Sequence, residues 1–92
     1  MKANEGIFKE HYEAINKVME FGAMKHGEGT WQYNSIILHL NKTLRHISKI
    51  MAGEYIDRES GFSHFAHIGC NIALAENIFS KINNKKNREK DE

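Results

Sequence analysis

Residues 63–82 read SHFAHIGCNIALAENIFSKI and carry the clearest helical pattern in the chain. Apolar side chains recur here every three or four positions, at Phe65, Ile68, Ile72, Ala75, Phe79 and Ile82. This spacing places them on one side of a helix. Ser63 stands directly before them and is a residue type that commonly caps helix N-termini. We therefore predict a helix that begins after Ser63 and buries this apolar stripe.

The same spacing occurs twice earlier in the sequence. A first helix is predicted from Asn4, a plausible N-cap, to about Gly22, with a stripe made of Phe8, Tyr12, Ile15 and Met19. A second is predicted from about Ser35 to a glycine stop at Gly53. Its apolar stripe consists of Ile37, Leu40, Leu44, Ile47 and Met51. The residues between the first two helices include two glycines and two aromatics, a composition typical of a loop.

These patterns predict an all-α protein of 92 residues without proline, folded as a small three-to-four-helix bundle. Residues 1–82 form the single expected domain, and residues 83–92 form a polar C-terminal tail that we expect to be flexible. Because so short a chain buries only a modest part of its surface, we expect self-association into a homo-oligomer to complete the bundle.

Composition narrows the possible environments and partners. Thirteen basic residues balance twelve acidic ones, for a net charge of +1, so nucleic-acid binding is not predicted. Cys70 is the single cysteine, which excludes an intramolecular disulfide and favours the cytoplasm. No apolar run reaches the length of a membrane-spanning helix, so no membrane contact is predicted.

Histidines and carboxylates gather around the connection between the second and third helices. Glu54, Asp57 and Glu59 lie in that connection, and His64 and His67 lie at the edge of the next apolar stripe. Antiparallel packing of the two helices would place these carboxylates near His64 and His67, in a cluster that suits a divalent cation. His39 and His46 of the second helix border the same core. An equally weighted interpretation is that the histidines are packed, hydrogen-bonded residues and that the carboxylates form a solvated turn.

The loop before the second helix offers weaker signals for nucleotide binding. Lys25 and the glycines that follow it can contact phosphate, although no Walker-type spacing is present. Trp31 and Tyr33 can stack on a base, but aromatic residues in such a loop more often close a core. His11 and His26 are expected at the surface, and Cys70 is not expected to act as a nucleophile.

Several motifs together resemble a known family. They are FGAMKHG at residues 21–27, Trp31, Leu44-Arg45-His46, GEYIDRESGFSHFAH at residues 53–67, and Cys70-Asn71. This order and spacing resembles the small phage and prophage dATP/dGTP diphosphohydrolase domains. The resemblance implies an all-α, MazG-like pyrophosphohydrolase that cuts a deoxynucleoside triphosphate to monophosphate and pyrophosphate with Mg²⁺ or Mn²⁺, Zn²⁺ being less expected. It also implies the host cytoplasm as the location.

Members of that group hold their metal with a Glu-x-x-Glu pair and a Glu-x-x-Asp pair. The matching pairs here are Glu10-x-x-Glu13 and Glu54-x-x-Asp57, which stand farther apart than usual. The resulting hypothesis assigns metal binding to Glu54, Asp57, His46, His64 and His67. It assigns catalysis to Glu59, as general base, and Asp57, and substrate binding to Lys25, Trp31, Tyr33, Arg45 and Asn71. The alternative functions are a phage protein that sequesters a nucleotide without cutting it and a helical adaptor for a host protein.

Overall fold

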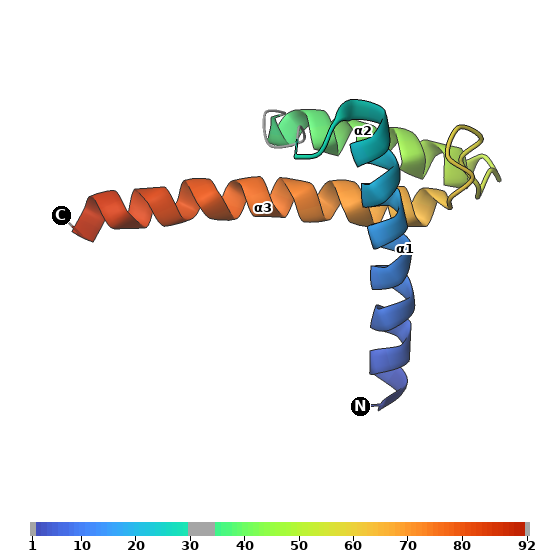
Figure 1. Ribbon diagram of the computed structural model, residues 1–92, viewed down its shortest axis with the longest axis horizontal. Coiled ribbons are helices and arrows are strands. Elements are labelled where there is room, and N and C mark those ends of the chain that lie inside the picture. Colours follow the sequence, from blue (N-terminus) through green and yellow to red (C-terminus); the bar gives the residue numbers. More distant parts are fainter. Residues whose placement is uncertain (1, 30–34, 92) are drawn as a thin grey trace.

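Three helices make up the chain in the computed structural model, which describes residues 2–29 and 35–91, with side chains for residues 5–29 and 35–85. They are α1 (Lys2–His26), α2 (Ile36–Met51) and α3 (His64–Asp91). Helices α2 and α3 lie side by side and antiparallel, and α1 crosses this pair (Figure 1). The prediction of a small all-α bundle is confirmed. No helix in the described part of the chain has the length and apolarity needed to cross a membrane.

The ends of α2 and the start of α3 lie where the sequence predicts them. The Ser35 hydroxyl accepts a hydrogen bond from the Leu38 N–H at 3.1 Å and caps α2. At the other end Gly53 has a φ of 92°, a conformation that favours glycine and ends the helix. The Ser63 hydroxyl accepts from the Ala66 N–H at 3.1 Å and caps α3. Local capping chemistry therefore sets these three boundaries.

Helices α1 and α3 both extend beyond the ends that we predicted. Helix α1 continues past Gly22 to His26, and Gly27, with a φ of 96°, follows its end. A single interior glycine costs a helix only about 1 kcal/mol relative to alanine, which is not enough to stop it. Helix α3 continues past Ile82 to Asp91, because the segment after Ile82 contains no glycine or proline to interrupt it.

The apolar core forms where α1 crosses α3. Val18 packs with Ala66 and Cys70, and partly buried neighbours surround them. Phe21 and Phe62 meet edge to face with ring centroids 6.2 Å apart. Gly69 lies at the same crossing, where a Cβ atom would come within 2.6 Å of His11 Nε2. The close approach of the two helices therefore fixes the position of the C-terminal half of α1.

The prediction that the apolar stripes form the core is wrong for most of their residues. Phe8 is 70% exposed, Leu44 is 61% exposed and Phe79 is 56% exposed. On α2 the buried side chains are instead His39, Thr43 and His46. Polar side chains occupy the α2–α3 contact because they hydrogen-bond one another there, which removes most of the cost of burying them.

Candidate functional site

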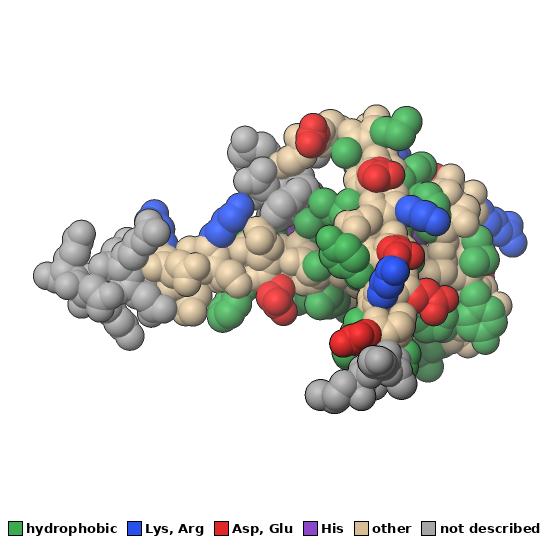
Figure 2. Space-filling model, turned by 60° about the horizontal axis from the view of Figure 1, so that its bottom comes forward, with side chains coloured by type: hydrophobic (Ala, Val, Ile, Leu, Met, Phe, Trp, Pro, Cys, Tyr) green, Lys and Arg blue, Asp and Glu red, His purple; other side chains and the backbone are tan. Residues whose placement is uncertain are grey.

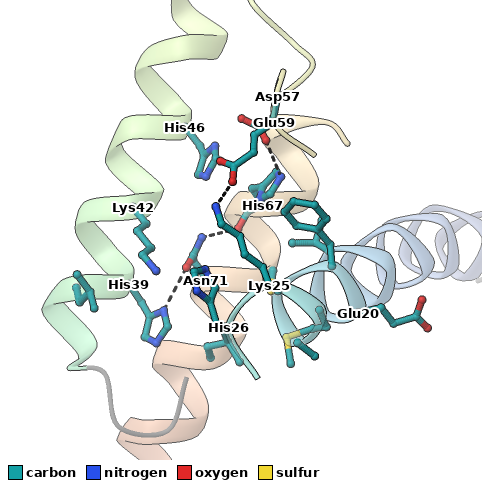
Figure 3. A pocket seen from close by; sticks show the side chains of 18 of the residues that line it. Glu20, Lys25, His26, His39, Lys42, His46, Asp57, Glu59, His67 and Asn71 are labelled. Atoms are coloured by element: carbon teal, nitrogen blue, oxygen red, sulfur yellow. Dashed lines mark hydrogen bonds and ion pairs between the residues drawn. The ribbon is translucent and has the colours of Figure 1, made fainter. Parts of the chain in front are cut away.

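A cavity of about 920 Å³ opens between the C-terminal part of α1, one side of α2 and the first half of α3. This volume is in the range of small-molecule sites, which span roughly 300–1,000 Å³. Its polar lining includes Lys25, Lys42, Arg45, His46, Asp57, Glu59, His67 and Asn71. Figure 3 shows several of these side chains converging from all three helices and the α2–α3 loop. The cavity is thus the place where most of the chemically active side chains meet.

Cationic side chains from two helices reach this cavity. Lys42 and Arg45 lie one helical turn apart on α2, and Lys25 comes from the last turn of α1. Lys25 forms an ion pair with Glu59 of the α2–α3 loop (Figure 3). Because both partners are substantially exposed, at 44% and 59%, this pair contributes little to stability and opens readily. The cavity lining therefore carries three cationic side chains together with four carboxylates, Glu20, Glu28, Asp57 and Glu59.

A chain of hydrogen bonds links Glu54, His64 and His46. Glu54 Oε2 lies 3.0 Å from His64 Nε2, and His64 Nδ1 lies 2.8 Å from His46 Nδ1. A carboxylate only accepts, so His64 Nε2 carries a proton. When both rings are neutral, His64 Nδ1 must accept and His46 Nδ1 must donate. This leaves Nε2 as the unprotonated nitrogen of His46, a ring that lines the cavity.

A second chain links Asp57, Ser60 and His67. Asp57 Oδ2 accepts from the Ser60 N–H at 3.0 Å and from the Ser60 hydroxyl at 2.8 Å. Since the hydroxyl proton is used in this way, His67 Nε2, 2.7 Å from Ser60 Oγ, must donate to it. Neutral His67 therefore has its lone pair on Nδ1. The α2–α3 loop thus fixes the orientation of an imidazole at the cavity wall.

Burial and neighbouring charge keep His46 and His67 neutral. Burial, followed by His67, His64 and Arg45, lowers the pKa of His46 to about 4. Burial is also the main cause that lowers the pKa of His67; Asp57 opposes it, while His64 and Arg45 add to it. The rings of His46 and His67 stack at 4.6 Å, so a proton on either ring would repel a proton on the other. Both rings are therefore unprotonated near neutral pH.

Asp57 stays ionised beside these rings. Burial alone would raise the pKa of Asp57, but the two hydrogen bonds from Ser60 outweigh burial and lower it, with a further contribution from His67. Deeper in the same wall, Asn71 donates through Nδ2 to the His67 carbonyl at 2.9 Å. Its Oδ1 consequently accepts from His39 Nδ1 at 3.1 Å. Asn71 thereby connects the two helices through fixed polar contacts.

Acid is expected to destabilise the fold through His46. Its pKa is about 4 in the folded protein and 6.5 when the ring is fully solvated, so the unfolded chain binds the proton first as pH falls. Neutral His46 contributes up to about 3 kcal/mol to the free energy of unfolding. This contribution is fully present above pH 6.5 and is lost as the pH falls from 6.5 to 4. Urea unfolding at pH 7, 5.5 and 4.5 measures it. His46→Gln should flatten the profile while His11→Gln, at an exposed position, should not; identical profiles for all three proteins would contradict the assignment.

The chain matches the sequence profile of one known family. The profile described as dATP/dGTP diphosphohydrolase, N-terminal, matches residues 4–89. The chain belongs to this family. No curated protein and no solved structure matches the chain. This match, to an N-terminal domain of dATP/dGTP diphosphohydrolases, confirms the family resemblance found in the sequence.

The structure brings together most of the residues that the sequence selected in this diphosphohydrolase-family chain. Glu54 contacts His64 at 3.0 Å and Asp57 lies 3.5 Å from His67, as antiparallel packing predicted. The cavity is lined by Lys25, Arg45, His46, Asp57, Glu59, His67 and Asn71. Glu54 and His64 lie outside this lining, with His64 only 2% exposed. Trp31 and Tyr33 lie outside the described residues.

Three contributors were not predicted from the sequence. Lys42 lines the cavity, Ser60 joins Asp57 to His67, and His39 forms a hydrogen bond with Asn71. The polar positions His39, Thr43 and His46 recur at helical spacing. This polar stripe was the feature of the sequence that indicated the buried side of α2. Lys42 and Arg45 lie beside it on the helix.

The donor atoms do not form one metal-binding group. Within residues 2–29 and 35–91 no three His, Cys, Asp or Glu side chains are arranged to hold a metal ion. The Nδ1 atoms of His46 and His64 face each other, and His67 Nε2 faces Ser60. Asp57 and Glu59 both line the cavity, and nucleotide-bound Mg²⁺ is typically held by one or two carboxylates plus phosphates. These two carboxylates therefore fit a cation that enters with a triphosphate.

Proposed function

We propose that this chain hydrolyses purine deoxynucleoside triphosphates to the monophosphate and pyrophosphate, in a phage or prophage setting in the host cytoplasm. The observation that carries the proposal is the convergence of three cationic side chains and two neutral, stacked histidines on one cavity. Membership in a family named for dATP/dGTP diphosphohydrolase supports the substrate class. A nucleotide-sized volume supports it as well.

In the proposed reaction Lys25, Lys42 and Arg45 bind the triphosphate. Their charges stabilise the negative charge that builds up on phosphate oxygens in the transition state. Asp57 and Glu59 would hold the divalent cation, Mg²⁺ or Mn²⁺, which would supply further charge neutralisation. When the nucleotide displaces the Lys25–Glu59 pair, both side chains become available for these roles.

His67 is the proposed general base. Its Nδ1 accepts a proton from a water molecule whose oxygen forms a bond to the α-phosphorus, and the bond from that phosphorus to the bridging oxygen breaks to release pyrophosphate. Ser60 and Asp57 position the ring through Nε2. The bound triphosphate also brings negative charge to the rings, which raises their pKa values toward neutrality. We prefer His67 to Glu59 for this role because Glu59 is assigned to the cation in this proposal, whereas His67 is held in a fixed orientation by Ser60.

Product analysis tests the proposal directly. The protein is incubated with each of the four deoxynucleoside triphosphates and Mg²⁺ or Mn²⁺, and the products are identified by mass spectrometry and ³¹P NMR. We expect monophosphate and pyrophosphate from dATP or dGTP, and no reaction with EDTA present. Diphosphate with inorganic phosphate would contradict the reaction. Intact nucleotide recovered from a stable complex would instead favour the sequestering function.

A further inference from the structure

The side of α2 that lines the cavity changes from apolar to cationic along the helix. Leu38, Lys42 and Arg45 line the cavity and are spaced by four and three residues, so they share one side of the helix. Leu38 lies near the start of α2, and Arg45 lies nearer the α2–α3 loop. This wall therefore offers apolar contact at one end and positive charge toward the other.

Helix α3 shows the same change on its cavity side. Leu74, Asn71 and His67 line the cavity and also share one side of their helix. The order from apolar to polar runs toward the start of α3, where the α2–α3 loop ends. Asp57 and Glu59 of that loop line the cavity as well. Both helices thus present polar side chains near the loop and a leucine away from it.

Leu38 and Leu74 lie at the same end of the cavity. His39 Nδ1 and Asn71 Oδ1 are 3.1 Å apart, so these two positions face each other across the antiparallel pair. Leu38 precedes His39, and Leu74 follows Asn71 by about one turn; in antiparallel helices both steps lead away from the loop. Figure 3 shows His39 and Asp57 at opposite ends of the site. We call the part formed by Leu38 and Leu74 the leucine end, and the part formed by Arg45, Asp57, Glu59 and His67 the loop end.

The position of the two leucines inside a cavity distinguishes them from other exposed apolar residues. Hydrophobic side chains also appear at the surface on both sides of the N-terminal part of α1 (Figure 2). Leu38, which is 39% exposed, instead lines a cavity whose other end is charged. Ligand pockets commonly combine apolar lining with a few polar groups that fix the orientation of the ligand. The cavity therefore suits a ligand that is apolar at one end and charged at the other.

The two ends are far enough apart to hold different parts of one nucleotide. Seven residues separate Leu38 from Arg45, and seven separate His67 from Leu74. At a rise of about 1.5 Å per residue, each pair is about 10 Å apart along its helix axis. A nucleotide has a flat base at one end and phosphates at the other, with a sugar between them. Its two ends can therefore occupy the two ends of the cavity.

The direction of binding follows from the proposed function, on which this inference rests. In that reaction His67 activates water next to the α-phosphorus, and Asp57 and Glu59 hold the cation that accompanies the phosphates. These groups form the loop end, so the β- and γ-phosphates extend toward the loop. The nucleoside is attached on the opposite side of the α-phosphorus. It must therefore extend toward the leucine end.

We propose that the nucleoside part of the substrate binds at the leucine end, with the base between Leu38 and Leu74 and the triphosphate directed toward the α2–α3 loop. The base covers apolar surface of Leu38 that water otherwise contacts, which favours binding. The reverse orientation would press charged phosphate oxygens against two leucines, at a large cost in desolvation. It would also leave Arg45 without a phosphate partner.

NMR of leucine methyl groups tests the orientation in the wild-type protein. The chain has four leucines, of which Leu38 and Leu74 line the cavity and Leu40 and Leu44 do not, so the second pair is an internal control. Deoxyadenosine should shift the methyl signals of Leu38 and Leu74 and leave those of Leu40 and Leu44 in place. Tripolyphosphate with Mg²⁺ should instead shift the ring signals of His67. Absence of deoxyadenosine-induced shifts at Leu38 and Leu74 would overturn the proposal.

Substitutions at each end should separate the two halves of the ligand by affinity. Leu38→Ser should raise the dissociation constant of deoxyadenosine by about tenfold and change that of Mg²⁺-tripolyphosphate by less than about twofold. Arg45→Met should have the opposite pattern. Met24→Ser is the control, because Met24 is 88% exposed and lies outside the cavity lining, and it should change neither constant. Equal losses of both ligands in Leu38→Ser would overturn the proposal.

None of these binding measurements requires turnover, so the orientation and the reaction can fail separately. Leucine shifts with deoxyadenosine, together with intact dATP in the product analysis, would remove the proposed reaction and support the orientation in a sequestering protein. Release of pyrophosphate without shifts at Leu38 and Leu74 would overturn the orientation and leave the reaction in place.

Discussion

Replacement of His67 by glutamine is expected to lower the rate of pyrophosphate release by about 10²- to 10⁴-fold, the usual contribution of a positioned general base. Glutamine retains an N–H group that can donate to Ser60 Oγ, which His67 contacts at 2.7 Å, but it lacks a nitrogen lone pair that accepts a proton. The loop contacts of Ser60 with Asp57 are therefore preserved while the base is lost. The change should appear in kcat, because the cationic side chains that bind the triphosphate are untouched.

Steady-state kinetics and equilibrium binding of a non-hydrolysable triphosphate separate these two effects. We expect nucleotide affinity of His67→Gln to remain close to that of wild type. His11→Gln is the control, since His11 is exposed on α1 outside the cavity lining. A kcat for His67→Gln within a few-fold of wild type would contradict His67 as the general base. If His46→Gln then lowered kcat by about 10²- to 10⁴-fold, the general base would be His46.

Local signals in the sequence were sufficient to predict the elements of the fold. Ser35 and Ser63 cap helices because their hydroxyl groups accept from backbone N–H groups three residues later. Gly53 ends α2 because the chain adopts a positive φ there. Such interactions involve residues close in sequence, so they can be predicted without knowledge of tertiary contacts.

The buried side of each helix could not be predicted in the same way. Hydrophobic spacing selected Leu44 and its neighbours for the interior, yet the structure buries His39 and His46 instead. Burial of a histidine is acceptable only when a partner from elsewhere in the chain satisfies it, here Asn71 and His64. Those pairings depend on the register between α2 and α3. The preference for apolar burial was therefore outweighed by a polar network that single-helix patterns do not describe.

Contacts in the candidate site could be predicted where the residues lie close together in the sequence. Glu54 and Asp57 precede α3 by a short loop, and antiparallel packing was enough to predict their contacts with His64 and His67. Glu59, in the same loop, pairs with Lys25 from α1. That contact depends on how α1 crosses α3, for which the sequence carried no directional signal. In our proposal Glu59 holds the cation, and His67 takes the general-base role that the sequence hypothesis gave to Glu59.

Replacement of Gly69 by alanine is the second change for which we expect a large effect, because side chains of α1 pack directly against Gly69 of α3. A Cβ atom there would lie 2.6 Å from His11 Nε2 and 2.7 Å from Ile15 Cδ1. Both side chains must move, and such overpacking typically costs about 1–3 kcal/mol. The same substitution at Gly6 of α1 meets nothing within 4 Å and should stabilise the helix by up to about 1 kcal/mol.

Urea unfolding at a fixed protein concentration measures the difference between Gly69→Ala and Gly6→Ala. His11→Ala removes the ring that the new methyl group meets, so the double variant Gly69→Ala/His11→Ala should be more stable than the two single changes predict when added. Strict additivity, or a Gly69→Ala protein as stable as Gly6→Ala, would contradict close packing at this crossing. Since the crossing also carries Lys25 to the cavity, a true displacement of α1 should weaken triphosphate binding in Gly69→Ala and leave it unchanged in Gly6→Ala.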